Sequence, residues 1–435
     1  MSALALAARR RGVAVTGCDV ETSAFPDLVA AGAAAFAGPD PSHVTGARAV
    51  VATAAAPADH AELQAARAAG VPIVYRKQAL AELVNGTTLV AIAGTHGKTT
   101  TTVMTTEALR AAGRHPSGLA GGRVNAWHGN AWLDGDDLFV VEADEYDQAF
   151  LTLRPTVAVV NNVEADHLEC YGSVAALESA FVEFAGRAAR ALIGTADAGS
   201  DRVARRLVTP SWRFGTDRGD LRCTLRHSGP DGSTADVALP DGRLIQLKLQ
   251  VPGVHNLRNA TAALGVVVAL GADIDASLQA LAAFSGVGRR FERLGDVSGV
   301  AIVDDYAHHP TELAATLAAA RQAYPDRRLV AVFQPHLYSR TREHGVAMGL
   351  ALAAADVVVV ADVYGAREQP VPGVTGKLVA DAAAGAGAAV EYHPDRATLA
   401  AAVADLVRSG DVLLTLGAGD VTQVGPAVSA LLGAR

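Results

Sequence analysis

A glycine-containing turn with a lysine and two threonines carries the strongest chemical signal in the sequence. It follows the apolar run Leu89–Ala93 and consists of Gly94, Thr95, His96, Gly97, Lys98, Thr99 and Thr100. A buried strand, this turn and a predicted helix over 101–112 would aim several backbone N–H groups at one anion. Lys98 adds a charge for the terminal phosphates, and the Thr99 hydroxyl can bind Mg²⁺. Ile92 replaces the first glycine of the strict GxxxxGK[ST] pattern, so a glycine-capped turn without a ligand is the alternative.

Acidic and histidine side chains follow two further apolar runs. Leu138–Val141 precedes the acidic segment 142–147, and Val157–Val160 precedes a segment that ends with His167. Carboxylates at the carboxyl end of a parallel strand, beside a phosphate loop, are expected to bind Mg²⁺. Glu142 and His167 are therefore candidate metal ligands, although a solvated loop and an ordinary surface histidine would give the same letters.

Two asparagines stand at the start of a long alanine-rich helix that we predict after Gly253. Asn256 and Asn259 would lie in its first turn. Asparagine is a common helix cap, whereas an accessible amide at this place could also hydrogen-bond a purine base.

In the last third of the chain, polar residues again follow apolar runs. The strands predicted here are Val300–Val303, Leu329–Phe333, Val357–Val360 and Val412–Leu416. The segments after the first two read DDYAHHP at 304–310 and QPHLYSRT at 334–341. Because open parallel sheets bind ligands at the carboxyl ends of their strands, we expect a second ligand-binding edge here.

These runs predict an α/β protein with doubly wound parallel sheets and three domains, at 1–85, 86–288 and 289–435. A chain of 435 residues is longer than one ordinary domain. The elements expected in the first domain are helix Ser2–Arg11, strand Val13–Gly17, strand Val50–Thr53, helix Ala61–Ala69 and strand Pro72–Tyr75. Alternating residues between about 208 and 250 predict antiparallel strands at one edge of the second domain.

The start of the first domain departs from the usual doubly wound fold, which opens with a strand and a glycine-rich turn. This sequence opens within a predicted helix, so we expect an incorrectly assigned start or a truncated chain. N-terminal sequencing of protein from the native host tests this expectation, and a mature chain that begins at Met1 or Ser2 would contradict it.

Composition narrows the class of partner. A net charge of −8 at pH 7 argues against nucleic acid and suits a small anionic substrate bound by one cationic loop. No run resembles a membrane span or a secretory signal. Cys18, Cys170 and Cys223 lack CxxC spacing, which is typical of reduced thiols in the cytosol. We therefore expect a cytoplasmic enzyme whose partners are small molecules, with no nucleic-acid or membrane partner.

Taken together, the motifs resemble the Mur ligase family of peptidoglycan synthesis over nearly the whole chain. In the family's order they read GTHGKTTT, EADE, NNVEADH, GVHNLRNA, GRRFE and DDYAHHPTE. QPHLYSRT and LGAGD resemble the branch that adds L-alanine. No lysine lies between Lys98 and Lys248, so the carbamylated lysine of several other branches is absent from its expected region. The resemblance implies a Rossmann-like first domain, a central phosphate-loop ATPase domain and a Rossmann-like third domain.

The resemblance also implies roles for individual residues. ATP would bind to the turn at 94–100 and to Asn256, Asn259, Arg290 and Asp305. Two Mg²⁺ ions would be bound with the help of Thr99, Glu142 and His167. The incoming amino acid would face Tyr306, His308 and Arg340, and the catalytic residues would be Lys98, His308 and Arg340.

The implied reaction is ATP-dependent amide formation between L-alanine and the lactyl carboxylate of UDP-N-acetylmuramate, through an acyl phosphate. Negative charge gathers where the carboxylate meets the γ-phosphate, so Mg²⁺ and Lys98 must neutralise both. Arg340 suits the alanine carboxylate, and His308 could take the ammonium proton. Closure of the third domain would accompany binding. The alternatives are a ligase that attaches a recycled tripeptide to the same UDP-sugar, and an inactive nucleotide-binding relic.

Overall fold

The computed structural model describes residues 1–57, 59–366 and 368–434. Its contacts separate two compact units. Unit 1 consists of Met1–Thr224, Asp236–Leu247 and Arg258–Ala282, and unit 2 of Leu225–Ala235, Lys248–Leu257 and Ala283–Arg435. Within the described residues, no helix has the length and apolar character needed to cross a membrane.

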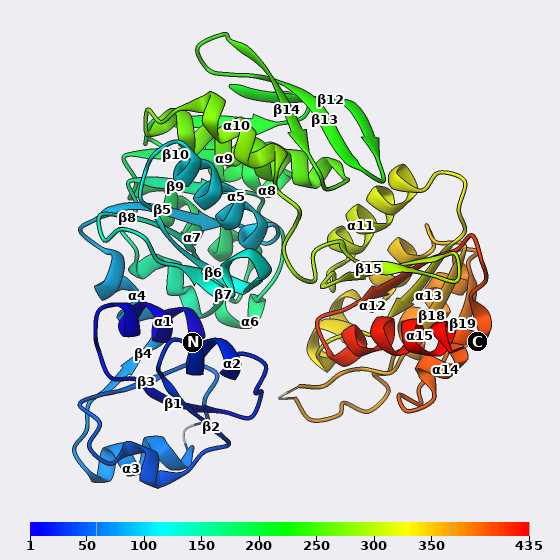
Figure 1. Ribbon diagram of the computed structural model, residues 1–435, viewed down its shortest axis with the longest axis horizontal. Coiled ribbons are helices and arrows are strands. Elements are labelled where there is room, and N and C mark those ends of the chain that lie inside the picture. Colours follow the sequence, from blue (N-terminus) through cyan, green and yellow to red (C-terminus); the bar gives the residue numbers. More distant parts are fainter. Residues whose placement is uncertain (58, 367, 435) are drawn as a thin grey trace. The chain divides into compact units, whose positions relative to one another are not determined.

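The larger of the two main sheets has ten strands in the order β14-β13-β12-β11-β10-β9-β5-β8-β6-β7 (Figure 1). The strands are β5 (Thr88–Ala93), β6 (Ser117–Val124), β7 (Gly129–Trp132), β8 (Leu138–Glu142), β9 (Val157–Val160), β10 (Arg190–Gly194), β11 (Ser211–Gly215), β12 (Leu221–Gly229), β13 (Gly232–Ala238) and β14 (Leu244–Leu249). Along the sheet, each strand from β11 through β10, β9, β5 and β8 to β6 is parallel to its neighbour. The edge strand β7 is antiparallel to β6.

Strand β5 lies inside this sheet, and its apolar residues 89–93 are fully buried. On one face, Leu89, Ala91 and Ala93 pack in one cluster with Phe181 and Phe184 of α7 (Val174–Gly186). A strand covered on both faces reads as a continuous apolar run, which is why the sequence predicted it correctly. The further helices of the region are α5 (Lys98–Ala111), α6 (Leu168–Tyr171), α8 (Ala198–Arg206), α9 (Val254–Ala269) and α10 (Ile274–Ala282), with the 3₁₀ helices η2 (Asn125–Trp127) and η3 (Tyr146–Thr152).

The prediction of antiparallel strands over 208–250 is wrong for β11. This strand runs parallel to β10, and it is also parallel to β12 where the two pair. Helix α8 connects β10 to β11, and a helical crossover brings the chain back in its original direction. Alternation of apolar and polar residues shows which face is buried, but it does not show which way a neighbouring strand runs.

Residues 1–84 form four short strands in two separate parallel pairs, β1–β2 and β3–β4. The elements are α1 (Ser2–Arg10), β1 (Thr16–Asp19), α2 (Phe25–Ala30), β2 (Ala34–Ala37), the 3₁₀ helix η1 (Pro41–Val44), β3 (Val50–Ala52), α3 (Ala61–Ala68), β4 (Ile73–Tyr75) and α4 (Arg76–Val84). Strand β1 does not begin at the predicted Val13, because the N–H groups of Gly12 and Val13 still bond to carbonyls at the end of α1.

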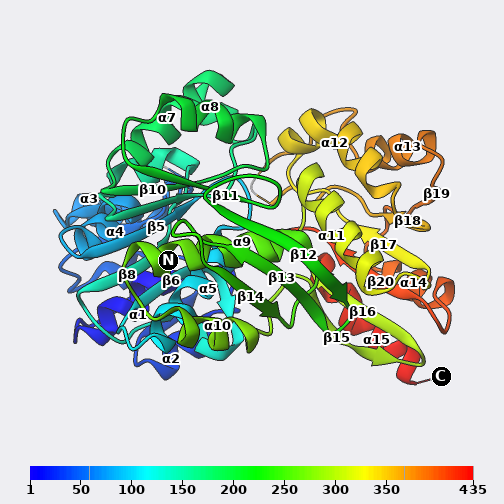
Figure 2. The ribbon, with the colours of Figure 1, turned by 90° about the horizontal axis from the view of Figure 1, so that it is seen from above.

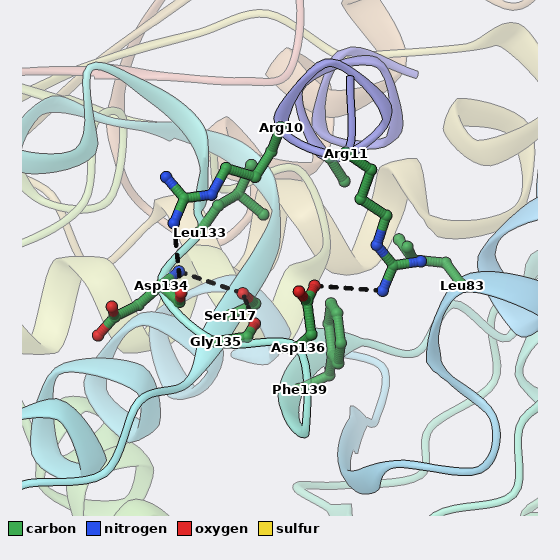
Figure 3. A pocket seen from close by; sticks show the side chains of 10 residues that line it. Arg10, Arg11, Leu83, Ser117, Leu133, Asp134, Gly135, Asp136 and Phe139 are labelled. Carbon is green, nitrogen blue, oxygen red and sulfur yellow. Dashed lines mark hydrogen bonds and ion pairs between the residues drawn. The ribbon is translucent and has the colours of Figure 1, made fainter. Parts of the chain in front are cut away.

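Helix α1 carries two arginines toward the segment before β8 (Figure 3). Arg11 Nη2 lies 3.4 Å from Asp136 Oδ1, and Arg10 Nη2 donates to the carbonyl of Asp134 at 3.4 Å. A cavity of only about 10 Å³ lies among these side chains. Such exposed contacts contribute little to stability, but they orient α1 along the sheet.

Unit 2 contains a six-stranded sheet in the order β15-β16-β20-β17-β18-β19. Its strands are β15 (Glu292–Val297), β16 (Val300–Asp305), β17 (Leu329–Phe333), β18 (Val357–Val360), β19 (Ala389–Tyr392) and β20 (Val412–Leu416). The edge strand β15 is antiparallel to β16, whereas the other pairs are parallel. The four predicted strands of this region are present, and β15 and β19 were not predicted.

Helices cover both faces of this second sheet (Figure 2). The helices are α11 (Pro310–Ala323), α12 (Tyr338–Leu352), α13 (Lys377–Gly385), α14 (Leu399–Leu406) and α15 (Val424–Gly433), with the 3₁₀ helix η4 (Asp420–Gln423). Side chains of α11, α12 and α13 pack in one apolar cluster, and those of α14 and α15 pack in another. The carboxyl ends of β16, β17, β18 and β20 therefore lie along one edge, because these strands are parallel.

Candidate active site

The turn between β5 and α5 has the geometry of a phosphate loop. Gly94 has φ 129° and Gly97 has φ 78°, and Gly97 is the N-cap of α5. A Cβ on Gly94 would lie 3.0 Å from the backbone N of both Asn161 and Asn162. The first N–H groups of a helix have no partner within it, so those of α5 face the turn as an anion site.

The segment after β9 holds this turn in place. The amide oxygen of Asn162 accepts a hydrogen bond from His96 N at 2.7 Å, and its carbonyl accepts one from Thr95 N at 3.2 Å. Glu164 contacts the same turn, with Oε2 3.1 Å from His96 Nε2. Sequence reasoning gave no role to Asn162 or Glu164, although their place in NNVEADH was the available signal.

Asn161 is a third residue of this segment to which sequence reasoning gave no role. Its amide nitrogen donates to Thr101 Oγ1 at 3.0 Å and to the carbonyl of His96 at 3.2 Å. Its Oδ1 is buried and has no hydrogen-bond partner among the described residues. A buried acceptor without a partner is costly, so this oxygen is a candidate acceptor for a group that the ligand brings.

Lys98 forms a buried ion pair with Glu145. Its Nζ lies 2.9 and 3.0 Å from the two carboxylate oxygens and donates to the carbonyl of Gly94 at 2.7 Å. Burial by itself would lower the pKa of Lys98, but Glu145, Asp144 and Glu142 outweigh it and raise this pKa above its ordinary value. Lys98 is therefore positively charged. A phosphate that binds here would have to replace the Glu145 carboxylate as its partner.

Glu142 and Thr99 form the candidate Mg²⁺ site. Glu142 Oε2 accepts from Thr99 Oγ1 at 2.9 Å and from the backbone N–H of Gly121 at 2.6 Å. One hydroxyl and one oriented carboxylate beside a phosphate loop are the oxygen ligands that Mg²⁺ takes together with phosphate and water. The residues present therefore fit the ion.

His167 also comes from the carboxyl edge of the large sheet, but it does not bond to Glu142. It adopts φ 53° at the start of α6 and packs edge-on against Tyr146, with the ring centroids 5.2 Å apart. Its Nδ1 lies 3.4 Å from Glu169 Oε1. Because Tyr146 belongs to the acidic segment 142–147, His167 lies beside the loop that carries Glu142, Asp144 and Glu145.

A glycine next to the candidate Mg²⁺ site allows a matched test. A Cβ on Gly121 would lie 2.8 Å from both carboxylate oxygens of Glu142, whereas a Cβ on Gly122 would make only an ordinary 3.6 Å contact with Thr99 Cγ2. We expect Gly121→Ala to push the flexible carboxylate aside and to raise the Mg²⁺ concentration for half-maximal phosphate release about tenfold or more. Mg²⁺ titration of the two alanine variants checks this, and equal midpoints would contradict it.

The two candidate adenine residues have different local surroundings. Asn259 is the sixth residue of α9 and so lies in its second turn, not in the first as predicted. It lies near the phosphate loop, because its Oδ1 would be 2.6 Å from a Cβ on Gly97. Asn256 donates to the carbonyl of Pro252 at 2.8 Å, as a residue in the first turn of α9. Both side chains are largely buried.

In unit 2, Asp305 holds two backbone groups. Its oxygens accept from Phe291 N and Ala307 N, each at 2.7 Å. Burial raises the pKa of Asp305 to about 6, although Arg290 opposes this shift. Asp305 thereby fixes the segment 289–291 against the end of β16. Its predicted contact with ATP stays a prediction.

Two arginines surround the ring of Tyr306. The guanidinium carbon of Arg289 lies 4.9 Å and that of Arg290 5.0 Å from the ring centroid. Arg289 also donates to the carbonyl of Gly417 at 2.6 Å, so it joins the segment before β15 to the end of β20. Sequence reasoning had selected Arg290 alone. The sequence does not show that Arg289 is the arginine that hydrogen-bonds to the end of β20.

His308 is held by the start of α11. Its Nδ1 lies 3.0 Å from the carbonyl of Tyr306 and 3.4 Å from Glu312 Oε2. Nδ1–H donates to that carbonyl, so Nε2 carries the lone pair. Burial lowers the pKa of His308 to about 4, with Glu312 opposing and Arg340 assisting this shift. The neighbouring His309 is the N-cap of α11 and accepts from Thr311 N at 3.4 Å.

Arg340 starts a chain of contacts along the same edge. Its Nη1 lies 3.5 Å from His336 Nδ1, and the His336 ring stacks on Tyr364 with centroids 5.8 Å apart. Tyr364 lines a cavity of about 350 Å³ at the ends of β17 and β18. The other polar residues that line it are Gln334, Asp362, Arg396 and Asp420.

The shifted pKa of His308 predicts a pH-dependent stability. Its folded pKa of about 4 lies below the unfolded value near 6.5, so the unfolded chain binds the proton first as the pH falls. We expect wild type to lose about 3 kcal/mol relative to His308→Gln between pH 7 and pH 4. Asp305, whose pKa is raised, makes the fold more stable as the pH falls, but wild type and the His308→Gln variant both contain it. Urea unfolding of the full-length wild type and of the full-length His308→Gln variant at pH 7 and pH 4 measures this difference. If the two proteins differ by the same unfolding free energy at both pH values, the prediction is contradicted.

Comparisons with known proteins match the whole chain to one family. The matching descriptions are "Mur ligase family, catalytic domain" at 1–88, "Mur ligase middle domain" at 92–267 and "Mur ligase, glutamate ligase domain" at 289–419. The UDP-N-acetylmuramate–L-alanine ligase of Kineococcus radiotolerans is 46% identical, covering 100% of this chain and 94% of the relative. That of Paenarthrobacter aurescens is 45% identical, covering 100% and 95%.

Two solved structures resemble the chain over its full length. The crystal structure of the UDP-N-acetylmuramate-alanine ligase from Thermotoga maritima has a TM-score of 0.85 at 28% identity, covering 100% of this chain and 97% of that one. The murein peptide ligase from Psychrobacter arcticus has a TM-score of 0.74 at 26% identity, with the same coverage of 100% and 97%.

Proposed function

We propose that this chain, which belongs to the Mur ligase family, joins L-alanine to the lactyl carboxylate of UDP-N-acetylmuramate at the expense of ATP. Its fold is the three-domain Mur ligase architecture, an α/β fold with parallel-rich sheets. The observation that carries the proposal is the full-length similarity to UDP-N-acetylmuramate–L-alanine ligases. The product is a precursor for peptidoglycan.

The first half of the reaction activates the carboxylate. A carboxylate oxygen of the sugar nucleotide attacks the γ-phosphorus of ATP, the bond to ADP breaks, and an acyl phosphate forms. The phosphate loop and the ammonium of Lys98 are proposed to hold the β- and γ-phosphates, and the helix terminus adds its N–H groups. Glu142, Thr99 and His167 would hold Mg²⁺. When bound, the ion would neutralise the negative charges of the carboxylate and the γ-phosphate.

The second half forms the amide. The amine of alanine attacks the acyl carbon, the bond to the phosphate oxygen breaks, and inorganic phosphate leaves. Attack needs a neutral amine, so a base must take the ammonium proton. His308 is proposed for this task, because its depressed pKa keeps Nε2 unprotonated at neutral pH. Arg340 would bind the alanine carboxylate in bidentate fashion.

We further propose two Mg²⁺ ions and small-molecule partners only, namely ATP, L-alanine and UDP-N-acetylmuramate. The net charge of −8 supports this, since it disfavours polyanionic partners. We also propose that the reaction takes place in the cytoplasm, where ATP is available. The roles of Asn256, Asn259 and Arg290 at ATP, and of Tyr306 at the amino acid, belong to the same proposal.

Phosphate release with ATP and UDP-N-acetylmuramate tests the activity. We expect release with L-alanine to exceed release with glycine or L-serine, and no release with the tripeptide L-alanyl-γ-D-glutamyl-meso-diaminopimelate. Release with the tripeptide alone would instead indicate a murein peptide ligase, the class with the TM-score of 0.74. ATP binding without turnover on any acceptor would indicate an inactive relic.

A further inference from the structure

Three side chains with metal-binding atoms meet within residues 1–84, and none of them is among the residues proposed for the reaction. Cys18 lies on β1, His43 on η1 and Glu62 on α3. One ligand atom from each side chain lies within 4.8 Å of the others. Thiolate, imidazole and carboxylate are the ligand types that Zn²⁺ takes in proteins.

Strand pairing and ring stacking bring these side chains together. Cys18 on β1 pairs with Phe36 on β2, and the Phe36 ring stacks on His43 with centroids 4.3 Å apart and planes at 17°. The stacking orients the imidazole, so its position does not depend on the loop alone. His43 Nδ1 lies 2.7 Å from Glu62 Oε1, and the same oxygen accepts from Asp40 N at 3.2 Å.

The three groups are shielded but accessible to an ion. The side chains of His43 and Glu62 are 17% and 13% exposed, and Cys18 is partly buried. Ligands around a tetrahedral Zn²⁺ ion lie about 3.3 to 3.8 Å apart, given bonds of 2.0 to 2.3 Å. His43 Nδ1 and Glu62 Oε1 are now 2.7 Å apart, and the three ligand atoms all lie within 4.8 Å of one another, so small side-chain movements suffice to reach these separations.

We propose that Cys18, His43 and Glu62 form a site for a thiophilic divalent cation of the Zn²⁺ class, with water as the fourth ligand. Without the ion, the Cys18 thiol and His43 Nδ1–H both donate to the Glu62 carboxylate. On binding, the thiol proton is released to solvent and the imidazole proton moves to Nε2. The hydrogen bonds to Glu62 are replaced by bonds to the ion.

Such a site would connect three elements that share little apolar core. The buried apolar residues of β1 to α3 are mostly small, namely Ala33, Val44, Ala52, Leu63 and Ala66. The strands here form only two-stranded sheets. Where apolar burial is limited, a bound metal contributes directly to folding stability. The ion would therefore stabilise this part of the chain and take no part in amide formation.

Cobalt substitution tests the proposal on the full chain. Excess Mg²⁺ is present throughout, so that sites with oxygen ligands are filled. We expect one equivalent of Co²⁺ to produce a strong thiolate-to-Co²⁺ absorption band in the near ultraviolet, and one equivalent of Zn²⁺ to remove it and to raise the melting temperature. Absence of the band in wild type would overturn the proposal.

Variants identify the ligands. Cys18→Ser should lose the band, and His43→Gln should weaken Co²⁺ binding by more than the roughly 10- to 100-fold that an outer-shell change costs. Cys170→Ser is the matched control, because Cys170 is the other partly buried cysteine and is close in sequence to His167. The band must persist in this control. Persistence in Cys18→Ser, or loss in Cys170→Ser, would overturn the assignment, and ATP binding reports that each variant is folded.

Discussion

Lys98→Met is expected to lower the rate of phosphate release about 10²- to 10³-fold, which is the usual effect of removing one preorganised charge donor. Lys98 is held at the mouth of the phosphate loop by the carbonyl of Gly94 and the carboxylate of Glu145. When ATP binds, its phosphates are expected to replace these partners, so methionine removes the ammonium group that would neutralise the transferred phosphate. Formation of the acyl phosphate should fail, and the second half of the reaction should fail with it.

The variant also leaves a buried carboxylate without its partner. Glu145 is 2% exposed, and breaking a buried pair costs about 3 to 5 kcal/mol. Lost activity could then reflect lost folding. The double variant Lys98→Met/Glu145→Gln removes both charges and should recover most of the unfolding free energy without recovering activity. If the double variant regains turnover, Lys98 acts through the fold and the proposed phosphate role is wrong.

His308→Gln is expected to separate the two halves of the reaction. Loss of a general base lowers a rate about 10²- to 10⁴-fold. The defect should fall on amide formation, because His308 is proposed to act on the alanine amine and not on the phosphates. Acyl phosphate should therefore still form from ATP and UDP-N-acetylmuramate, and hydroxylamine should trap it at close to the wild-type rate.

A second histidine of unit 2 supplies the control. His393 contacts Glu391 and Thr398 beyond the end of β19, outside the proposed machinery. His393→Gln should keep turnover within about twofold of wild type, as expected for a surface substitution. If His308→Gln blocks trapping as strongly as turnover, the residue positions unit 2 and does not act as the base.

Much of the fold could be predicted because its strands are buried on both faces. The runs at β9, β17, β18 and β20 were predicted with the bounds that the structure has. Their continuous apolar runs are typical of strands that are buried on both faces of a parallel sheet. Short, half-exposed elements gave no such signal, and β2, β15 and β19 were not predicted. The buried strand β10 was also not predicted, because its apolar run comprises only Ala191–Ile193.

The candidate site was predicted as residue types and only partly as contacts. The letters placed Lys98, Glu142 and His167 at strand ends of one sheet. They did not reveal that Glu145 is the present partner of Lys98, or that Asn162 fixes the loop. The acidic segment carries four carboxylates, and the sequence does not show which of them contacts Lys98 or Thr99. Only the distances in the structure distinguish them.

The sequence by itself determined where the chain turns and which chemical groups stand at those turns, because glycine, apolar runs and helix caps act through local sterics and burial. The tertiary structure decided which of those groups meet. Cys18, His43 and Glu62 lie on three different elements, and Asp305 bonds to backbone on both sides of its own strand. Such contacts depend on how strands pair and helices pack, and no local pattern of residues encodes the resulting distances.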